Sequence, residues 1–107
     1  MKKREKILQT AKQRLRSKFG EKIKDIVLYG SQAWGRPTSA SDWDFVVVVR
    51  GDYDWRTVQA IRYTMADLDM ELGVFTQTLV VSESELKDSI ERYEPIFTKA
   101  LSQGIYA

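Results

Sequence analysis

The feature that most constrains the fold is an unbroken apolar run, Phe45-Val-Val-Val-Val49, which follows directly after two aspartates. A strand that is apolar at every position has both of its faces covered, as happens in a sheet with packed layers on either side. We therefore expect a central strand over residues 43–49. The predicted strand ends at the segment Arg50-Gly51-Asp52.

The segments on either side of this run alternate between helical and strand patterns. Apolar residues spaced by three and four predict helices over 4–19 and 54–72, which Gly20 and Gly73 end. Strands are expected over 24–29 and 74–81, and a capping box at Ser82-Glu-Ser-Glu85 predicts a helix from 83 to about 93. A last helix is expected from about 95 to 103. The order predicts a single α/β domain over 1–107, a short sheet flanked by helices.

Length and composition agree with one folded domain. The chain has 107 residues, of which 43% are apolar and 30% are charged, as in ordinary globular proteins. No apolar run is long enough to span a bilayer, and the charged beginning lacks the apolar core of a secretion signal. The chain has no cysteine, so we expect a cytoplasmic protein without a membrane association.

Histidine is absent as well, which excludes several kinds of catalysis. Triads, zinc sites and general bases that depend on histidine cannot be built from this chain. Any catalysis therefore relies on carboxylates, hydroxyls, lysine and arginine, and such groups suit a hard cation such as Mg²⁺. The first 18 residues are strongly basic. Because the net charge is only +2, we favour a solvated helix face over a nucleic-acid surface.

Two adjacent segments carry the groups expected of a phosphate and metal site. Asp42 and Asp44 alternate with Trp43 at the entrance of the central strand, so both carboxylates point to one side. Two such carboxylates can converge on a divalent ion, and without a cation their repulsion raises a pKa. The preceding strand ends at Gly30-Ser31, where backbone N–H groups and a hydroxyl can bind phosphate oxygens. A solvated strand entrance is the plainer alternative.

At these residues the chain resembles a known family. The segment LYGSQAWGRPTSASDWDF is similar to the Gly-Ser, spacer, Asp-x-Asp signature of the minimal nucleotidyltransferases of the DNA polymerase β superfamily. The resemblance implies a nucleotidyltransferase fold with a short mixed sheet flanked by helices. It implies that Gly30 and Ser31 bind the triphosphate and that Asp42 and Asp44 ligate Mg²⁺. Where relatives often carry arginine this chain has Trp34, and Arg36 is a candidate for that phosphate contact.

The resemblance also implies a reaction and a partner. The reaction would transfer a nucleoside monophosphate, AMP from ATP, to a hydroxyl group. Family members of this size are often encoded beside a small helical HEPN-domain toxin and act as its antitoxin. A nucleoside triphosphate and a HEPN-type protein are therefore the expected partners. A homo-oligomer or a partner chain could supply the walls that a chain this short lacks.

The pattern departs from the family at the third strand. The superfamily commonly uses a third carboxylate there, and the matching position in this chain is Gln77 or Thr76. The nearby acids Asp67, Asp69 and Glu71 fall on the predicted helix; a boundary error of a few residues would return Asp69 or Glu71 to the site. Loss of a general base typically costs about 10²–10⁴ in rate. The second hypothesis is accordingly a catalytically weak or inactive nucleotide-binding antitoxin that neutralises its partner by contact.

Small-molecule modification, such as nucleotidylation of an antibiotic, is a third interpretation that we favour less. Those enzymes usually carry an added substrate domain, for which 107 residues leave no room. Trp34, Trp43 and Trp55 could stack a nucleobase. Tryptophans more often serve the core or an interface, and that is the role we expect for these three.

Overall fold

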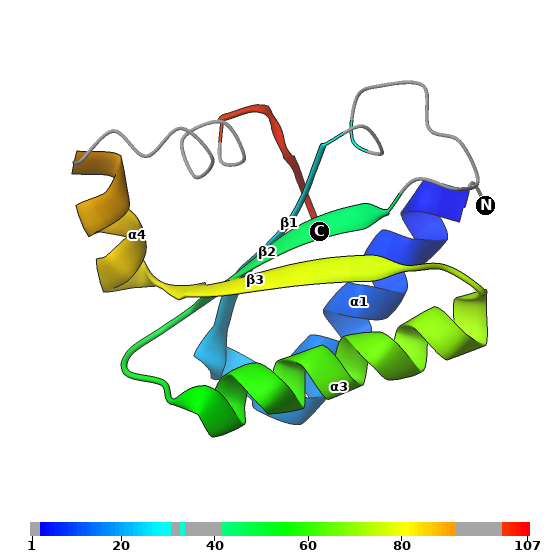
Figure 1. Ribbon diagram of the computed structural model, residues 1–107, viewed down its shortest axis with the longest axis horizontal. Coiled ribbons are helices and arrows are strands. Elements are labelled where there is room, and N and C mark those ends of the chain that lie inside the picture. The colour runs from blue at the N-terminus through cyan, green and yellow to red at the C-terminus, as the bar shows by residue number, and fades with distance from the viewer. Residues whose placement is uncertain (1–2, 31–32, 34–41, 92–101) are drawn as a thin grey trace.

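The structure is a computed structural model that describes residues 3–30, 33, 42–91 and 102–107, and Figure 1 shows its arrangement. A long first helix and a short 3₁₀ turn lead into the sheet, and two further helices flank the third strand. In chain order the elements are α1 (Lys3–Phe19), η1 (Gly20–Lys22), β1 (Ile23–Tyr29), β2 (Trp43–Val49), α3 (Trp55–Leu72), β3 (Thr76–Ser82), α4 (Glu83–Glu91) and β4 (Ile105–Tyr106).

The sheet is mixed and has the strand order β3-β2-β1-β4. Strand β1 pairs antiparallel with both β2 and β4, whereas β2 and β3 run parallel and are joined by α3. The apolar run thus lies in an inner strand, where Phe45 and the four valines that follow it are all fully buried. The prediction of a short mixed sheet flanked by helices is confirmed.

The two faces of β2 meet different partners, because successive side chains of a strand point to opposite sides. Phe45 and Val47 belong to the larger core, which α1 and α3 complete with residues such as Leu15 and Leu68. Val46 and Val48 belong to a smaller cluster on the opposite face, where Leu86 of α4 covers them. Figure 1 shows α1 and α3 together on one side of the sheet and α4 at one end of it.

Helix α3 has the predicted extent, and its ends show why. Asp54 is the N-cap, and its Oδ1 accepts hydrogen bonds from the backbone N–H groups of Arg56 (3.0 Å) and Thr57 (3.2 Å). At the other end Gly73 adopts a left-handed conformation, and the backbone N–H of Val74 reaches the Asp69 carbonyl oxygen at 3.1 Å. The helical period therefore identified both ends correctly.

The second half of the chain departs from the prediction in two places. The third strand covers Thr76–Ser82 instead of 74–81, because Val74 and Phe75 form the connection between the turn at Gly73 and the strand. The predicted capping box is present: the Glu85 N–H donates to Ser82 Oγ at 3.1 Å, and the Ser82 N–H donates to Glu85 Oε1 at 3.3 Å. Most of the predicted last helix falls outside the described residues. The two-residue strand β4 that follows was not predicted.

Strand β3 forms an edge of the sheet, and three side chains bind backbone groups along it. Asp69 Oδ2 accepts from the Thr76 N–H at 3.2 Å, and Glu85 accepts from the Ser82 N–H. Between them the Tyr53 hydroxyl donates to the Val80 carbonyl oxygen at 3.4 Å. Unpaired edge groups are templates for another strand, so these three side chains partly close the edge.

Within the described part of the chain, no helix combines the length and the apolar character needed to cross a membrane. Helix α1 is the most basic element, and several of its arginines have structural roles. Arg4 donates to the Ala33 carbonyl oxygen at 2.8 Å, Arg16 donates to that of Ile23 at 2.9 Å, and Arg14 pairs with Glu71 of α3. These contacts favour the interpretation of the basic segment as an ordinary amphipathic helix.

Candidate active site

The centre of the candidate site is a row of three side chains across three strands. In the sheet register Asp44 of β2 is opposite Tyr29 of β1 on one side and Gln77 of β3 on the other. Residues that pair across strands point to the same face. That face is the one that carries Val46 and Val48, away from α1 and α3. The row lies at the end of β2 where the chain enters the strand.

Asp42 joins this row through a hydrogen bond to Gln77. The Nε2 atom of Gln77 lies 2.7 Å from Asp42 Oδ2, a short distance for an amide and a carboxylate. Asp42 precedes the first residue of β2, and Gln77 is the second residue of β3. The parallel register therefore places Gln77, and not Thr76, beside the aspartates.

The electrostatics of the site are set by two neighbouring carboxylates, one of them partly buried. Burial raises the pKa of Asp44 above its ordinary value, and the negative charge of Asp42 raises it further. Burial also raises the pKa of Tyr29, to which the charge of Asp44 adds. A positive charge placed beside Asp44 would lower the pKa of both Asp44 and Tyr29, because it stabilises their ionised forms. The site is therefore suited to a cation.

Gly30 approaches Asp44 more closely than any other residue type could. Its φ angle is +79°, and a Cβ built on it would lie 2.8 Å from Asp44 Oδ2. A distance this short is a steric clash, so a side chain at position 30 would push the carboxylate aside. Sequence reasoning assigned Gly30 to close approach of a phosphate; the structure adds close approach of the Asp44 carboxylate. The contact depends on the antiparallel pairing of β1 with β2, which no local sequence pattern specifies.

The acids of α3 lie elsewhere. Asp69 sits on the side of β3 that faces α3, where its carboxylate binds the Thr76 N–H. Glu71 pairs with Arg14, and Asp67 is exposed on the helix. The alternative in which a boundary error returns Asp69 or Glu71 to the aspartate pair is wrong, because α3 extends to Leu72.

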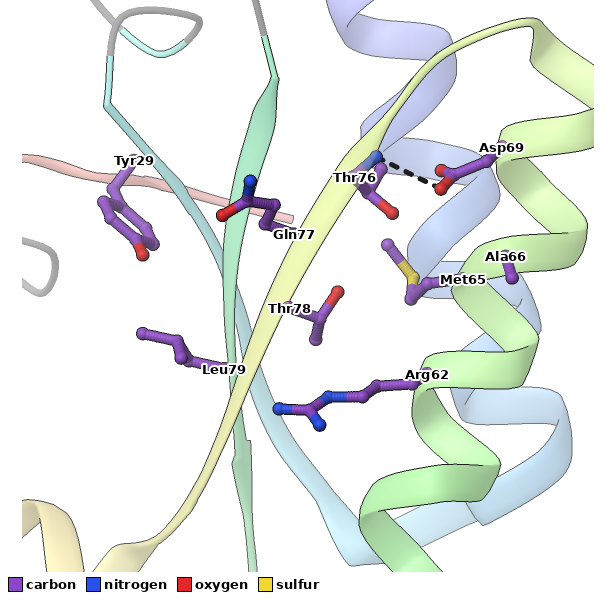
Figure 2. Close-up of a pocket in the computed structure, with 9 residues that line it drawn as sticks. All are labelled: Tyr29, Arg62, Met65, Ala66, Asp69, Thr76, Gln77, Thr78 and Leu79. Atoms are coloured by element: carbon purple, nitrogen blue, oxygen red, sulfur yellow. Dashed lines mark hydrogen bonds between the residues drawn. The ribbon is translucent and has the colours of Figure 1, made fainter.

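A cavity of about 560 Å³ surrounds the edge of β3 next to this site. Figure 2 shows Tyr29, Gln77 and Leu79 on one side of the strand and the α3 side chains on the other. On the α3 side, Asp69 Oδ1 and the Thr78 hydroxyl are buried without a hydrogen-bond partner among the described residues. Burial raises the pKa of Asp69, which the hydrogen bonding of Thr76 partly opposes.

Several residues that the sequence singled out are not placed. Ser31, Trp34 and Arg36 lie outside the described residues, so the expected phosphate contacts remain predictions. Of the other two tryptophans, Trp43 is 6% exposed and belongs to the core. Trp55 is 66% exposed at the start of α3, with the guanidinium carbon of Arg56 5.3 Å from its ring centroid.

The donor set agrees with a magnesium ion that is held only in part by protein. Among the described residues no group of three or more His, Cys, Asp or Glu side chains could hold a metal ion. The candidate site offers two carboxylates and one amide. Mg²⁺ is commonly held by one or two carboxylates together with substrate phosphates and water. Asp42 and Asp44 are accordingly the residues that would hold it.

Comparison with known proteins agrees with the fold. The family model of the nucleotidyltransferase domain matches residues 8–98, most of the chain. The protein therefore belongs to the nucleotidyltransferase domain family. No curated protein and no solved structure matches the chain.

Proposed function

We propose that the protein is a Mg²⁺-dependent nucleotidyltransferase that transfers AMP from ATP to a hydroxyl group. The observation that carries the proposal is the pair Asp42 and Asp44, at the mouth of the inner strand β2 in a chain of this family. Asp44 is held beside Gly30, and burial together with the negative charge of Asp42 raises its pKa; a bound cation would counter the repulsion between the two carboxylates.

Each part of the site has a role in this reaction. Asp42 and Asp44 would hold Mg²⁺, which when bound neutralises charge on the triphosphate and the developing charge on pyrophosphate. Gly30, Ser31 and Arg36 would bind the phosphates. The acceptor oxygen forms a bond to the α-phosphorus while the bond to pyrophosphate breaks. The hydroxyl proton leaves to solvent, because a neutral amide at Gln77 cannot accept it.

For the acceptor we propose a hydroxyl on a HEPN-type toxin, with the chain acting as a cytoplasmic antitoxin. The motif resemblance supports this assignment. Gln77 in the position of the third carboxylate favours a second candidate function, neutralisation of the toxin by contact alone.

Transfer of labelled AMP tests the proposal. Purified protein would be incubated with Mg²⁺, α-labelled ATP and the proposed HEPN-type partner, and label on the acceptor would be measured. We expect transfer by the wild type and at least about a 10²-fold loss in Asp44→Asn, because charge stabilisation of the transition state is worth this much. Asp67→Asn, which changes an exposed acid on α3, is the matched control and should transfer normally.

Absence of transfer by the wild type would sink the proposal, as would normal transfer by Asp44→Asn. The contact function makes a separate prediction. Under it Asp42→Ala and Asp44→Ala would still protect cells from the toxin, whereas the catalytic function requires that protection is lost.

A further inference from the structure

Gln77 sets the charge of the candidate site. Two carboxylates meet at the site, Asp42 just before β2 and Asp44 within it, and the side chain beside them on β3 is a neutral amide. An acid at position 77 would bring the formal charge of these three side chains from −2 to −3. Because Mg²⁺ gives up its water reluctantly, the number of anionic ligands strongly affects whether it binds.

The orientation of the Gln77 amide follows from its partner. An ionised carboxylate only accepts hydrogen bonds, so the NH₂ group must be the end that faces Asp42. The bond to Oδ2 at 2.7 Å occupies one lone pair of Asp42 and holds its carboxylate in place. The Gln77 side chain is exposed, and its carbonyl oxygen has no hydrogen-bond partner among the described residues. This oxygen is a neutral ligand and not a replacement for an anion.

We infer that Gln77 makes metal binding conditional on nucleotide: the free protein binds Mg²⁺ weakly, and the phosphates of the nucleotide supply the missing anionic ligands. The inference rests on the proposed function, because it takes Asp42 and Asp44 as the metal ligands. Gln77 is a positioning residue here. It orients Asp42 and withholds a third negative charge.

Isothermal titration of Mg²⁺ and Mn²⁺ tests the inference without any measurement of catalysis. Each metal would be titrated into the protein alone and in the presence of a non-hydrolysable ATP analogue. For the wild type we expect the analogue to raise metal affinity at least about 10-fold, since the phosphates add ligands of opposite charge. Equal metal affinity with and without the analogue, in a protein that binds the analogue, would overturn the inference.

The variant Gln77→Glu gives the second, independent comparison. We expect it to bind Mg²⁺ alone at least about 10-fold more tightly than the wild type, because a third carboxylate joins the site. Gln77→Ala loses the bond to Asp42 and should bind the metal alone no better than the wild type. Gln9→Glu makes the same charge change at an exposed position of α1 and is the control.

The outcomes separate this inference from the proposed function. Unchanged metal affinity in a folded Gln77→Glu protein would refute the inference, whatever the transfer assay shows. Failure of the wild type to bind the analogue would refute the proposed function, while the comparison of Gln77→Glu with wild type in metal alone would still decide the role of Gln77. Circular dichroism of each variant establishes that it is folded.

Discussion

At the scale of single residues, Gly30 and Asp44 depend on each other. Gly30 is left-handed, and the space where its side chain would be is occupied by the Asp44 carboxylate. A left-handed conformation costs other residues roughly 1–2 kcal/mol. The clash adds to that cost and acts on a side chain of the candidate site.

Gly30→Ala should therefore damage both stability and binding. We expect a loss of about 1–2 kcal/mol in the free energy of unfolding from the backbone alone, and a further loss of metal and nucleotide affinity from the displaced carboxylate. Urea unfolding and calorimetric titration measure the two effects. Gly73→Ala is the matched control, because Gly73 has a φ angle of +65° and nothing within 4 Å of its built Cβ. If both variants bind normally, Gly30 does not position Asp44.

The raised pKa of Asp44 predicts how stability changes with pH in the metal-free protein. Because folding raises this pKa, the folded state holds a proton over a pH range in which the unfolded state has lost it. Unfolding then releases protons, so the free energy of unfolding falls as pH rises from the ordinary pKa, 3.8, through the raised value. Below that range Asp44 causes no loss in the free energy of unfolding, and above it the loss has reached its full size.

Urea unfolding at a series of pH values, with chelator present, measures this penalty. Asp44→Asn removes the titrating group, so the stability of the variant relative to wild type should increase as pH rises through the range. Added Mg²⁺ with nucleotide should remove most of the wild-type penalty, because a cation stabilises the ionised carboxylate. A difference between the two proteins that is independent of pH would contradict the explanation.

At the scale of elements, Asp69 connects α3 to the first residue of β3. Its Oδ2 accepts a hydrogen bond from the Thr76 N–H, while its Oδ1 is buried and has no partner among the residues that the structure describes. Burial raises the pKa of the Asp69 carboxyl. The contact holds the strand that carries Gln77 against the helix. The negative charge of Asp69 therefore destabilises the fold, whereas the hydrogen bond that its Oδ2 accepts stabilises it.

Two substitutions at Asp69 separate charge from hydrogen bonding. Asp69→Asn keeps an acceptor for Thr76 and removes a poorly solvated charge, so we expect no loss of stability at neutral pH and normal AMP transfer. Asp69→Ala leaves the Thr76 N–H unsatisfied and should cost about 1–3 kcal/mol. Urea unfolding and the transfer assay check both variants. Loss of transfer in a stable Asp69→Asn protein would mean that this acid serves catalysis after all.

Helices and strands could be predicted from the sequence where a local pattern, such as apolar spacing or a capping residue, determines them. The period of apolar residues and the caps at Asp54 and Gly73 identified α3, and the apolar run identified β2. Strand β4 has only two residues, and its pairing with Val27 and Leu28 of β1 comes from tertiary contact that no local pattern carries.

For the candidate site, the sequence predicted the aspartates and the position of Gln77 by counting along strands. It could not predict that the Gln77 amide binds Asp42, because this depends on the register between β2 and β3. Nor could it predict the contact between Gly30 and Asp44, which depends on the antiparallel pairing of β1 and β2. Counting along the sequence also did not decide whether Asp69 lies on the helix or beside the aspartate pair. The observed extent of α3 places it on the helix.

At the scale of the whole molecule, the two faces of the sheet have separate tasks. The face covered by α1 and α3 holds most of the core and stabilises the fold. The other face carries Asp44 and Gln77 at one end and the small cluster under α4 at the other. A reaction partner can therefore reach the carboxylates from a side that the main core does not need.

The side chains that bind the edge of β3 also limit how copies of this protein can assemble. A symmetric dimer that extends the sheet at the β3 edge would have to displace Asp69, Tyr53 and Glu85 from the backbone groups they bind. Two of these belong to helices on different sides of the strand, so the displacement would disturb α3 and α4 together. These contacts therefore oppose an oligomer in which two copies pair through their β3 edges.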